Sequence, residues 1–348
     1  MKRLLLFFLV FISGCIAVPT PSFYSLQEYP PTWTPAPTPT NTPPGPTATH
    51  VIQRTPGAAP TRDPNARVLP TSSRGGIGVW MELDARSPQA VLDLLPRAQV
   101  IVTDGAGANA RKPNQTLLFS TSISLTAETL APAYGGIVLE KIPPDAATAL
   151  SSLRNRLKPR LVLARSSFTD MTGLDTALLN LDGVLLENFL RPPDAPPDQF
   201  PDEAAWRKQL GTLSTLSSAP NTVVLTATRF SRDMQIELPV VEQWVNYALG
   251  SFLLGANNTH AFFGFPDAKQ QQLINVPALN AQLGLPNGGT FKGSGVYQRR
   301  FTRGLVLVNP TTDKHVVALS RPYQDASGAA VPQLEMLPHT GVVLLNAE

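Results

Sequence analysis

The chain has 348 residues, 15% of them charged, a net charge of +3 and a single cysteine. Lys and Arg are scattered and do not gather on one expected face, so nucleic-acid binding is not indicated. With only one cysteine there can be no intrachain disulfide, and a folded domain must hold together by packing.

The first 14 residues have the order of a signal peptide. Two basic residues precede an apolar run from Leu4 to Ile12, which is too short to span a hydrocarbon core of roughly 30 Å as a helix. The run leads into Ile-Ser-Gly-Cys, which resembles the lipobox of bacterial lipoproteins. We therefore expect residues 1–14 to be removed and Cys15 to carry a lipid that anchors the protein to a membrane, outside the cytoplasm. An ordinary secretory peptide with an incidental cysteine is the alternative.

A proline-rich segment follows the cysteine. Residues 16–70 contain 14 of the 35 prolines, mixed with Thr, Ala and Gly. This composition cannot bury a core and favours extended polyproline II, so we predict a tether over residues 15–70 that works as a spacer. A docking ligand for a proline-binding module and an O-glycosylated stalk are the alternatives.

From residue 71 onward, short β-rich runs alternate with longer connections. Most runs are near-continuous apolar segments, as in Val184-Leu185-Leu186, which is typical of strands buried on both faces of a parallel sheet. Eight runs match a (β/α)8 TIM barrel, an α/β fold that we predict over residues 71–275. The expected strands are Gly76–Leu83, Gln99–Thr103, Thr116–Ser122, Gly136–Ile142, Arg160–Ala164, Asp182–Phe189, Thr222–Thr228 and His260–Phe265.

Helical spacing appears in two connections, residues 144–157 and 238–254, whereas the connection between Thr103 and Thr116 has almost none. The buried faces are expected to contain Ala147, Leu150, Leu153 and Leu157 in the first helix, and Trp244, Ala248 and Phe252 in the second.

The pattern changes after the eighth run. Short or alternating apolar runs are separated by Gly, Pro and Asp, which predicts a small antiparallel β module over residues 276–348. Its expected strands are Val296–Phe301, Gly304–Asn309, His315–Leu319 and Val342–Leu345.

Two of the barrel strands end alike, each with glycine and aliphatic residues followed by a glutamate, Glu140 or Glu187. Side chains at the carboxyl ends of barrel strands line the site where TIM barrels carry out chemistry. Two carboxylates across a sugar-sized gap can cleave a glycosidic bond, one as acid and one as base or nucleophile. Burial and mutual repulsion would separate their roles. The alternative is that each glutamate pairs with a basic residue at the barrel rim, for instance Arg165.

Other polar residues fall at strand ends, among them Glu82 and Asp84 at the end of the first expected strand. As a set they suggest sugar contacts, although each is individually typical of a loop or a helix cap. Aromatic residues Trp80, Tyr134, Phe189 and Trp244 could stack on a sugar, but their spacing is more typical of a core. The expected sugar contacts are Asp84, Asp104, Asn188, Thr226 and Arg229.

Several other chemistries are not supported. The four histidines lack metal-ligand spacing and no cysteine follows Cys15, so no metal is expected. The glycine-rich motifs that bind nucleotides are missing, so no cofactor is expected. No Gly-x-Ser-x-Gly motif follows a strand, which argues against a serine nucleophile.

Four segments resemble hypothetical glycoside hydrolase family 15: Leu181–Phe189, Tyr247–Ala256, Val296–Phe301 and Gly304–Pro310. The resemblance implies a TIM barrel that acts on, or binds, an extracellular polysaccharide or oligosaccharide. The family typically closes its fourth strand with aspartate, where this chain has Glu140, a change that fits a shifted substrate or a pseudoenzyme that keeps the groove. The resulting hypothesis is a surface-anchored, monomeric glycoside hydrolase-like protein. A noncatalytic carbohydrate-binding or envelope-scaffold lipoprotein is the alternative.

Overall fold

A computed structural model of the chain describes residues 66–72, 75–83, 95–105, 114–121, 130–142, 146–171, 174–231, 234–265 and 276–347. The expected signal peptide, the lipidation site Cys15 and residues 15–65 of the tether lie outside these ranges, as does Asp84. The tether prediction is wrong for residues 66–70, which pack on the barrel: Arg67 Nε lies 3.1 Å from Asp182 Oδ2, and Leu69 packs against the interior cluster. The folded part belongs to one compact unit, Pro60–Glu348. None of the helices in the described ranges combines the length and apolar character needed to cross a membrane.

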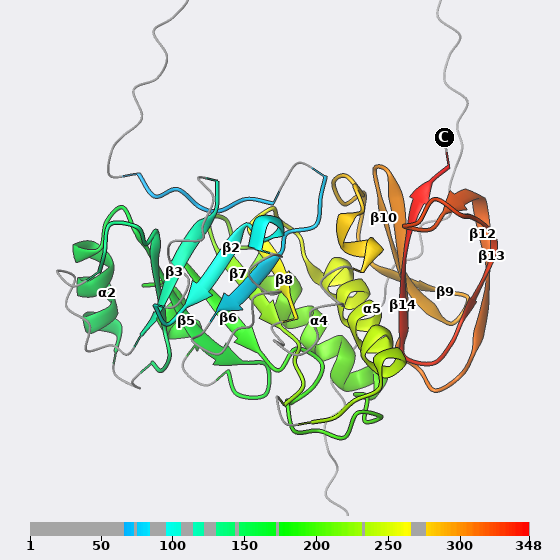
Figure 1. The fold of residues 1–348 in the computed structure, drawn as a ribbon, viewed down its shortest axis with the longest axis horizontal. Helices are drawn as coiled ribbons and strands as arrows, with labels where there is room; N and C mark the ends of the chain where they lie inside the picture. The colour runs from blue at the N-terminus through cyan, green and yellow to red at the C-terminus, as the bar shows by residue number, and fades with distance from the viewer. Residues whose placement is uncertain are drawn as a thin grey trace, which may run out of the picture. The chain divides into compact units, whose positions relative to one another are not determined.

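Eight parallel strands follow one another around a barrel in chain order, which confirms the predicted fold class (Figure 1). A parallel bridge between Val79 and Phe263 joins the last strand to the first. Each of the eight predicted runs overlaps one strand, and β5 extends three residues past its predicted end. The strands are β1 (Trp80–Leu83), β2 (Val100–Thr103), β3 (Thr116–Thr121), β4 (Gly136–Leu139), β5 (Leu161–Ser167), β6 (Gly183–Glu187), β7 (Val223–Ala227) and β8 (Ala261–Gly264).

The strands are continuous apolar runs because the side chains on both of their faces are buried. One set of side chains, including Val102, Leu163 and Leu185, fills the barrel interior, and the next residues along each strand pack outward. Trp80 lies in the interior beside Gly264, where an added Cβ would lie 2.3 Å from the indole nitrogen. Both faces are therefore buried, as a closed barrel requires.

Helices pack on the outside of the barrel. They are α2 (Ala147–Arg156), α3 (Leu174–Leu178), α4 (Glu203–Ser218) and α5 (Leu238–Gly255), with 3-10 turns η1 (Leu95–Arg97) and η5 (Pro277–Asn280). The predicted face of α5 is buried. On α2 the prediction is wrong for Ala147, which is exposed because the helix begins there, and Ala146 is the buried residue. The connection between β2 and β3 lies partly outside the described residues, so its lack of a helix stays a prediction.

Six antiparallel strands form the C-terminal sheet, in the order β13-β12-β14-β11-β10-β9. Four predicted strands are present, and β9 and β13 were not predicted. Exposed residues and Pro332 give β13 no clean alternation, as is typical of an edge strand. The bounds are β9 (Phe291–Gly293), β10 (Val296–Phe301), β11 (Gly304–Asn309), β12 (His315–Gln324), β13 (Ala330–Met336) and β14 (Thr340–Asn346).

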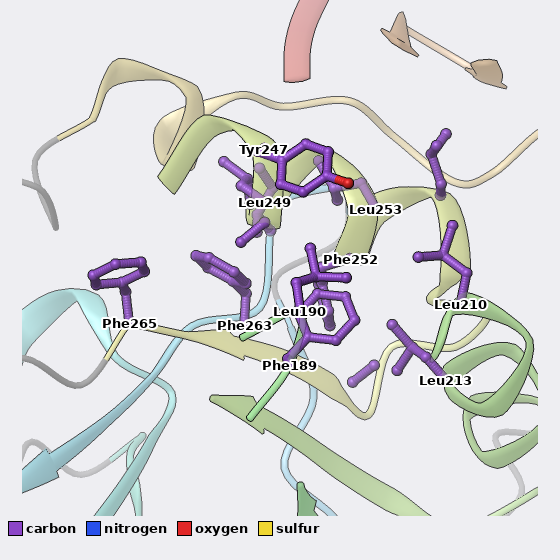
Figure 2. Close-up of a cluster of buried hydrophobic side chains, with 14 of the residues drawn as sticks. Phe189, Leu190, Leu210, Leu213, Tyr247, Leu249, Phe252, Leu253, Phe263 and Phe265 are labelled. Carbon is purple, nitrogen blue, oxygen red and sulfur yellow. The ribbon is translucent and has the colours of Figure 1, made fainter. Parts of the chain in front are cut away.

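Helix α5 joins the sheet to the barrel. Its residues share one buried cluster with Val306 and Val343 of the sheet and Phe263 of the barrel. Figure 2 shows Tyr247 and Phe252 of α5 within this cluster of aromatic and aliphatic side chains. An added Cβ at Gly341 would lie 2.2 Å from a carbonyl oxygen of α5, so glycine permits this close approach. The barrel and the sheet therefore share a core.

Candidate active site

Five charged side chains meet at the carboxyl ends of the barrel strands. Each stands two positions after an inward-facing apolar residue of its own strand, so strand alternation directs it toward the barrel mouth. We call this group the mouth cluster, and it consists of Glu82 in β1, Glu140 after β4, Arg165 in β5, Glu187 in β6 and Arg229 after β7.

Four members of the mouth cluster form a closed ring of alternating charge. Arg165 donates to Glu82 at 2.6 Å and to Glu187 at 2.8 Å, through separate Nη atoms. Arg229 Nη2 lies 2.7 Å from Glu187 Oε1 and 3.1 Å from Glu82 Oε2. These side chains are between 12% and 28% exposed, so the pairs are partly shielded from solvent. Two carboxylates and two guanidiniums balance one another.

Glu140 is the third carboxylate and stands outside this ring. Its side chain is 43% exposed and lies 3.1 Å from Arg165 Nε. The Ser120 hydroxyl also donates to it. Glu140 and Glu187 therefore contact the same guanidinium through different nitrogens, Nε and Nη1 of Arg165.

The pKa shifts follow from these contacts. Burial alone would raise the pKa of Glu82, but Arg229 and Arg165 outweigh burial and hold that pKa below its usual range. Burial likewise opposes the charge of Arg165, and its carboxylate neighbours overcome this and raise its pKa. The Glu82–Arg165 pair is therefore charged at neutral pH.

Glutamine at position 82 should make stability less dependent on pH. Because the folded-state pKa of Glu82 is lowered, its contribution is present above its ordinary value of 4.5 and is lost as the pH falls through the folded pKa. We expect Glu82→Gln to lower the free energy of unfolding at pH 7 by about 2 kcal/mol, with the difference from the parent shrinking toward pH 3. Urea unfolding at both pH values measures it. Glu242→Gln, at an exposed position of α5, is the control, and a difference that stayed constant with pH would contradict the argument.

Two predicted sugar contacts lie in or beside the mouth cluster. Arg229 belongs to it, and Asn188 directly follows Glu187 with a left-handed backbone, φ 61°. Its amide donates to Ser167 Oγ at 2.8 Å. Asp104 follows β2 at an exposed position, close enough to Tyr134 to contribute, after burial, to the raised pKa of that phenol.

Thr226 requires a correction, because it does not reach the mouth. The next residue, Ala227, faces the barrel interior, so alternation turns Thr226 outward beneath the helices. It is fully buried, and its hydroxyl donates to the Phe262 carbonyl at 3.4 Å. Asp84 lies outside the described residues, and its proposed contact stays a prediction.

The four aromatic residues singled out in the sequence are core residues. Each is at most 9% exposed, and the Trp80 indole donates to the Thr226 carbonyl at 2.7 Å. Within the described ranges, no group of three or more His, Cys, Asp or Glu residues is arranged to hold a metal ion.

The end of β1 offers both Glu82 and Asp84, and the predicted sugar contacts include Asp84 alone. Period-two alternation from Trp80 already places Glu82 in the phase that faces inward. The pairing of Glu140 and Glu187 with a basic residue at the rim, considered as the alternative, is present: Arg165 contacts both glutamates and Glu82 as well.

The family model for hypothetical glycosyl hydrolase family 15 matches residues 138–305, which confirms the resemblance seen in the sequence. The matched range contains every member of the mouth cluster except Glu82. This likeness to glycoside hydrolases supports a carbohydrate-active function.

Solved structures similar to the chain include a family 5 glycoside hydrolase from Bacteroides vulgatus, 11% identical, covering 83% of this chain and 95% of that one, with a TM-score of 0.43. A GH18 chitinase from Pseudoalteromonas aurantia is 12% identical and covers 56% of this chain and 96% of its own, with a TM-score of 0.38. A xylanase and α-amylase inhibitor protein from Scadoxus multiflorus is 11% identical over 59% of this chain and 97% of its own, with a TM-score of 0.38. The comparison with curated proteins found no match.

Proposed function

We propose that this protein is a membrane-anchored glycoside hydrolase that cleaves an extracellular polysaccharide with Glu187 and Glu140. The observation that supports it most is the meeting of these two carboxylates, from strands β4 and β6, on one guanidinium at the carboxyl ends of a barrel. Both lie within the segment that matches a glycoside hydrolase family model.

The two glutamates have different surroundings, which suggests different roles. Glu187 accepts hydrogen bonds from both Arg165 and Arg229, a setting suited to a carboxylate that acts ionised, as nucleophile or as base. Glu140 is more exposed and contacts one guanidinium only, so we assign it the proton for the leaving oxygen.

Product formation tests the proposal. The purified protein would be incubated with a panel of neutral, acidic and amino-sugar polysaccharides, and released oligosaccharides would be followed by mass spectrometry. We expect cleavage of at least one class, and NMR of the freshly released anomer would distinguish inversion from retention. Cleavage that persists in the Glu140→Gln, Glu187→Gln double variant would remove the assignment.

A noncatalytic carbohydrate-binding or envelope-scaffold protein is the second candidate. The ion pairs favour it, because Arg165 engages both glutamates and structural pairing alone accounts for those contacts. Binding of a polysaccharide in calorimetry, unchanged in the double variant and without any released product, would select this candidate over the hydrolase.

We also propose that Cys15 carries the membrane anchor and that residues 15–65 form a spacer between the membrane and the barrel. The sequence order of a short apolar run followed by Ile-Ser-Gly-Cys supports this. In a bacterial host, Cys15→Ser should abolish incorporation of labelled fatty acid and move the protein out of the detergent phase, whereas Ser25→Ala should behave as the parent. Equal labelling of the parent and the Cys15 variant would rule out this anchor.

A further inference from the structure

A buried arginine stands behind the mouth cluster, four residues after Glu187. Arg191 is 1% exposed, and its Nη1 donates to the backbone carbonyl of Arg229 at 3.0 Å. Its Nη2 donates to the Ala195 carbonyl. The guanidinium lies 3.8 Å from the centre of the Phe230 ring. Arg191 thus ties the loop after β6 to the loop after β7.

This arginine is costly to bury. Among the described residues no carboxylate forms a salt bridge with it, and its Nε is buried without an acceptor. Burial lowers its pKa to about 10, against a weaker opposing effect of Asp194. Contacts with the aromatic faces of Phe230 and Trp244 offset part of the desolvation. An apolar residue of similar length would avoid the rest, so stability alone does not explain an arginine here.

The chain between Glu187 and Arg191 is unusual in its backbone as well. Asn188 and Leu190 both have left-handed φ values, 61° and 65°, and a leucine rarely adopts this conformation. Hydrogen bonds continue past the ends of the strands: Phe189 N–H donates to the Ala227 carbonyl at 2.9 Å. The Thr228 hydroxyl donates back to the Phe189 carbonyl, also at 2.9 Å. Unfavourable backbone positions of this kind persist where the surrounding contacts fix them, and they cluster at functional sites.

We propose that Arg191 is a positioning residue that fixes the backbone of Arg229 and thereby sets its guanidinium against Glu187 and Glu82. The consequence for catalysis rests on the proposed function, whereas the consequence for the mouth cluster does not. Two hydrogen bonds link Arg191 to the mouth cluster through Arg229. Arg191 Nη1 donates to the Arg229 carbonyl at 3.0 Å, and Arg229 Nη2 donates to Glu187 Oε1 at 2.7 Å. Loosening the first contact lets the second lengthen, and catalytic groups tolerate displacements of only about 0.5 Å.

Titration of the glutamate side chains tests the proposal without requiring any activity. In ¹³C NMR of protein labelled at the glutamate carboxyl carbon, Arg191→Met should raise the titration midpoint of Glu82 by about half a pH unit or more, because Arg229 no longer holds its carboxylate. Arg191→Lys retains a charge and a donor to the Arg229 carbonyl, so its Glu82 midpoint should lie between those of the parent and of Arg191→Met.

Arg299 offers a matched control. It is also buried, 5% exposed, and donates to the backbone carbonyls of Leu253, Leu254 and Ala256 at the end of α5 rather than to the mouth cluster. Arg299→Met also removes a buried guanidinium and should leave the Glu82 midpoint unchanged.

The outcomes test the positioning role of Arg191 separately from the proposed hydrolase function. An unchanged Glu82 midpoint in folded Arg191→Met, or an equal change in Arg299→Met, overturns the positioning role. If Arg191→Met does not fold, a crystal structure of Arg191→Lys decides, since an undisturbed Arg229 guanidinium there also overturns it. If the hydrolase exists, kcat in Arg191→Lys should fall about 10-fold with KM little changed. If the Glu82 midpoint shifts in Arg191→Met but the parent protein cleaves no glycan, the positioning role stands and the proposed function is wrong.

Discussion

Replacing Glu187 with glutamine is expected to lower kcat about 10⁴-fold on every glycan the protein cleaves. The amide has the volume of the carboxylate, and its oxygen can still accept the hydrogen bonds that Arg165 and Arg229 donate to Oε1. The change therefore removes the charge and the nucleophilic or basic oxygen while keeping the geometry. Steady-state kinetics on the natural glycan and on an aryl glycoside with an activated leaving group measure it.

The contrast with Glu140 makes this prediction specific. An acid that protonates the leaving oxygen matters little when the leaving group departs readily as an anion, so Glu140→Gln should lose about 10²-fold or more on the natural glycan and little on the aryl glycoside. Glu187→Gln should lose activity on both. Glu242→Gln, remote from the mouth cluster on α5, should match the parent. Equal losses on both substrates in both glutamate variants would contradict the assigned roles.

The barrel could be predicted from the sequence because each of its strands is a short apolar run. Buried parallel strands such as β2 and β7 are apolar on both faces, and such runs are readable without knowing their neighbours. The edge strand β13 was missed for the opposite reason: its residues are largely exposed, and sheet pairing rather than pattern holds it in place.

The candidate site was only partly predictable. Glu140 and Glu187 follow from a repeated local motif, whereas the ring depends on pairs such as Arg165 and Glu82, which lie 83 positions apart and meet only when the barrel closes. Thr226 was misplaced because its position at a strand end was considered without the phase of its neighbours. Side chains along a strand point alternately into and out of the barrel, and this decides which strand-end residues reach the mouth. The alternation directs Glu82 toward the mouth and Thr226 away from it.

Arg165→Met is expected to have the largest effect on stability, lowering the free energy of unfolding at pH 7 by about 3 kcal/mol. Methionine keeps much of the length but leaves Glu82, Glu140 and Glu187 with Arg229 as the remaining cation of the mouth cluster. Unpaired carboxylates that are partly shielded from water repel one another and lose solvation.

The pH dependence distinguishes this cause from simple loss of packing. Carboxylates deprived of their cation take up protons more readily when folded, so the destabilisation should be greatest near neutral pH and should shrink as acid protonates them. Arg165→Lys should recover part of the stability by restoring charge without the several directed donors of a guanidinium. Arg300→Met, at an exposed position of β10, should change stability by less than about 0.5 kcal/mol. A loss in Arg165→Met that was equal at pH 7 and pH 4 would mean that the methylene packing of Arg165, rather than its charge, holds the mouth together.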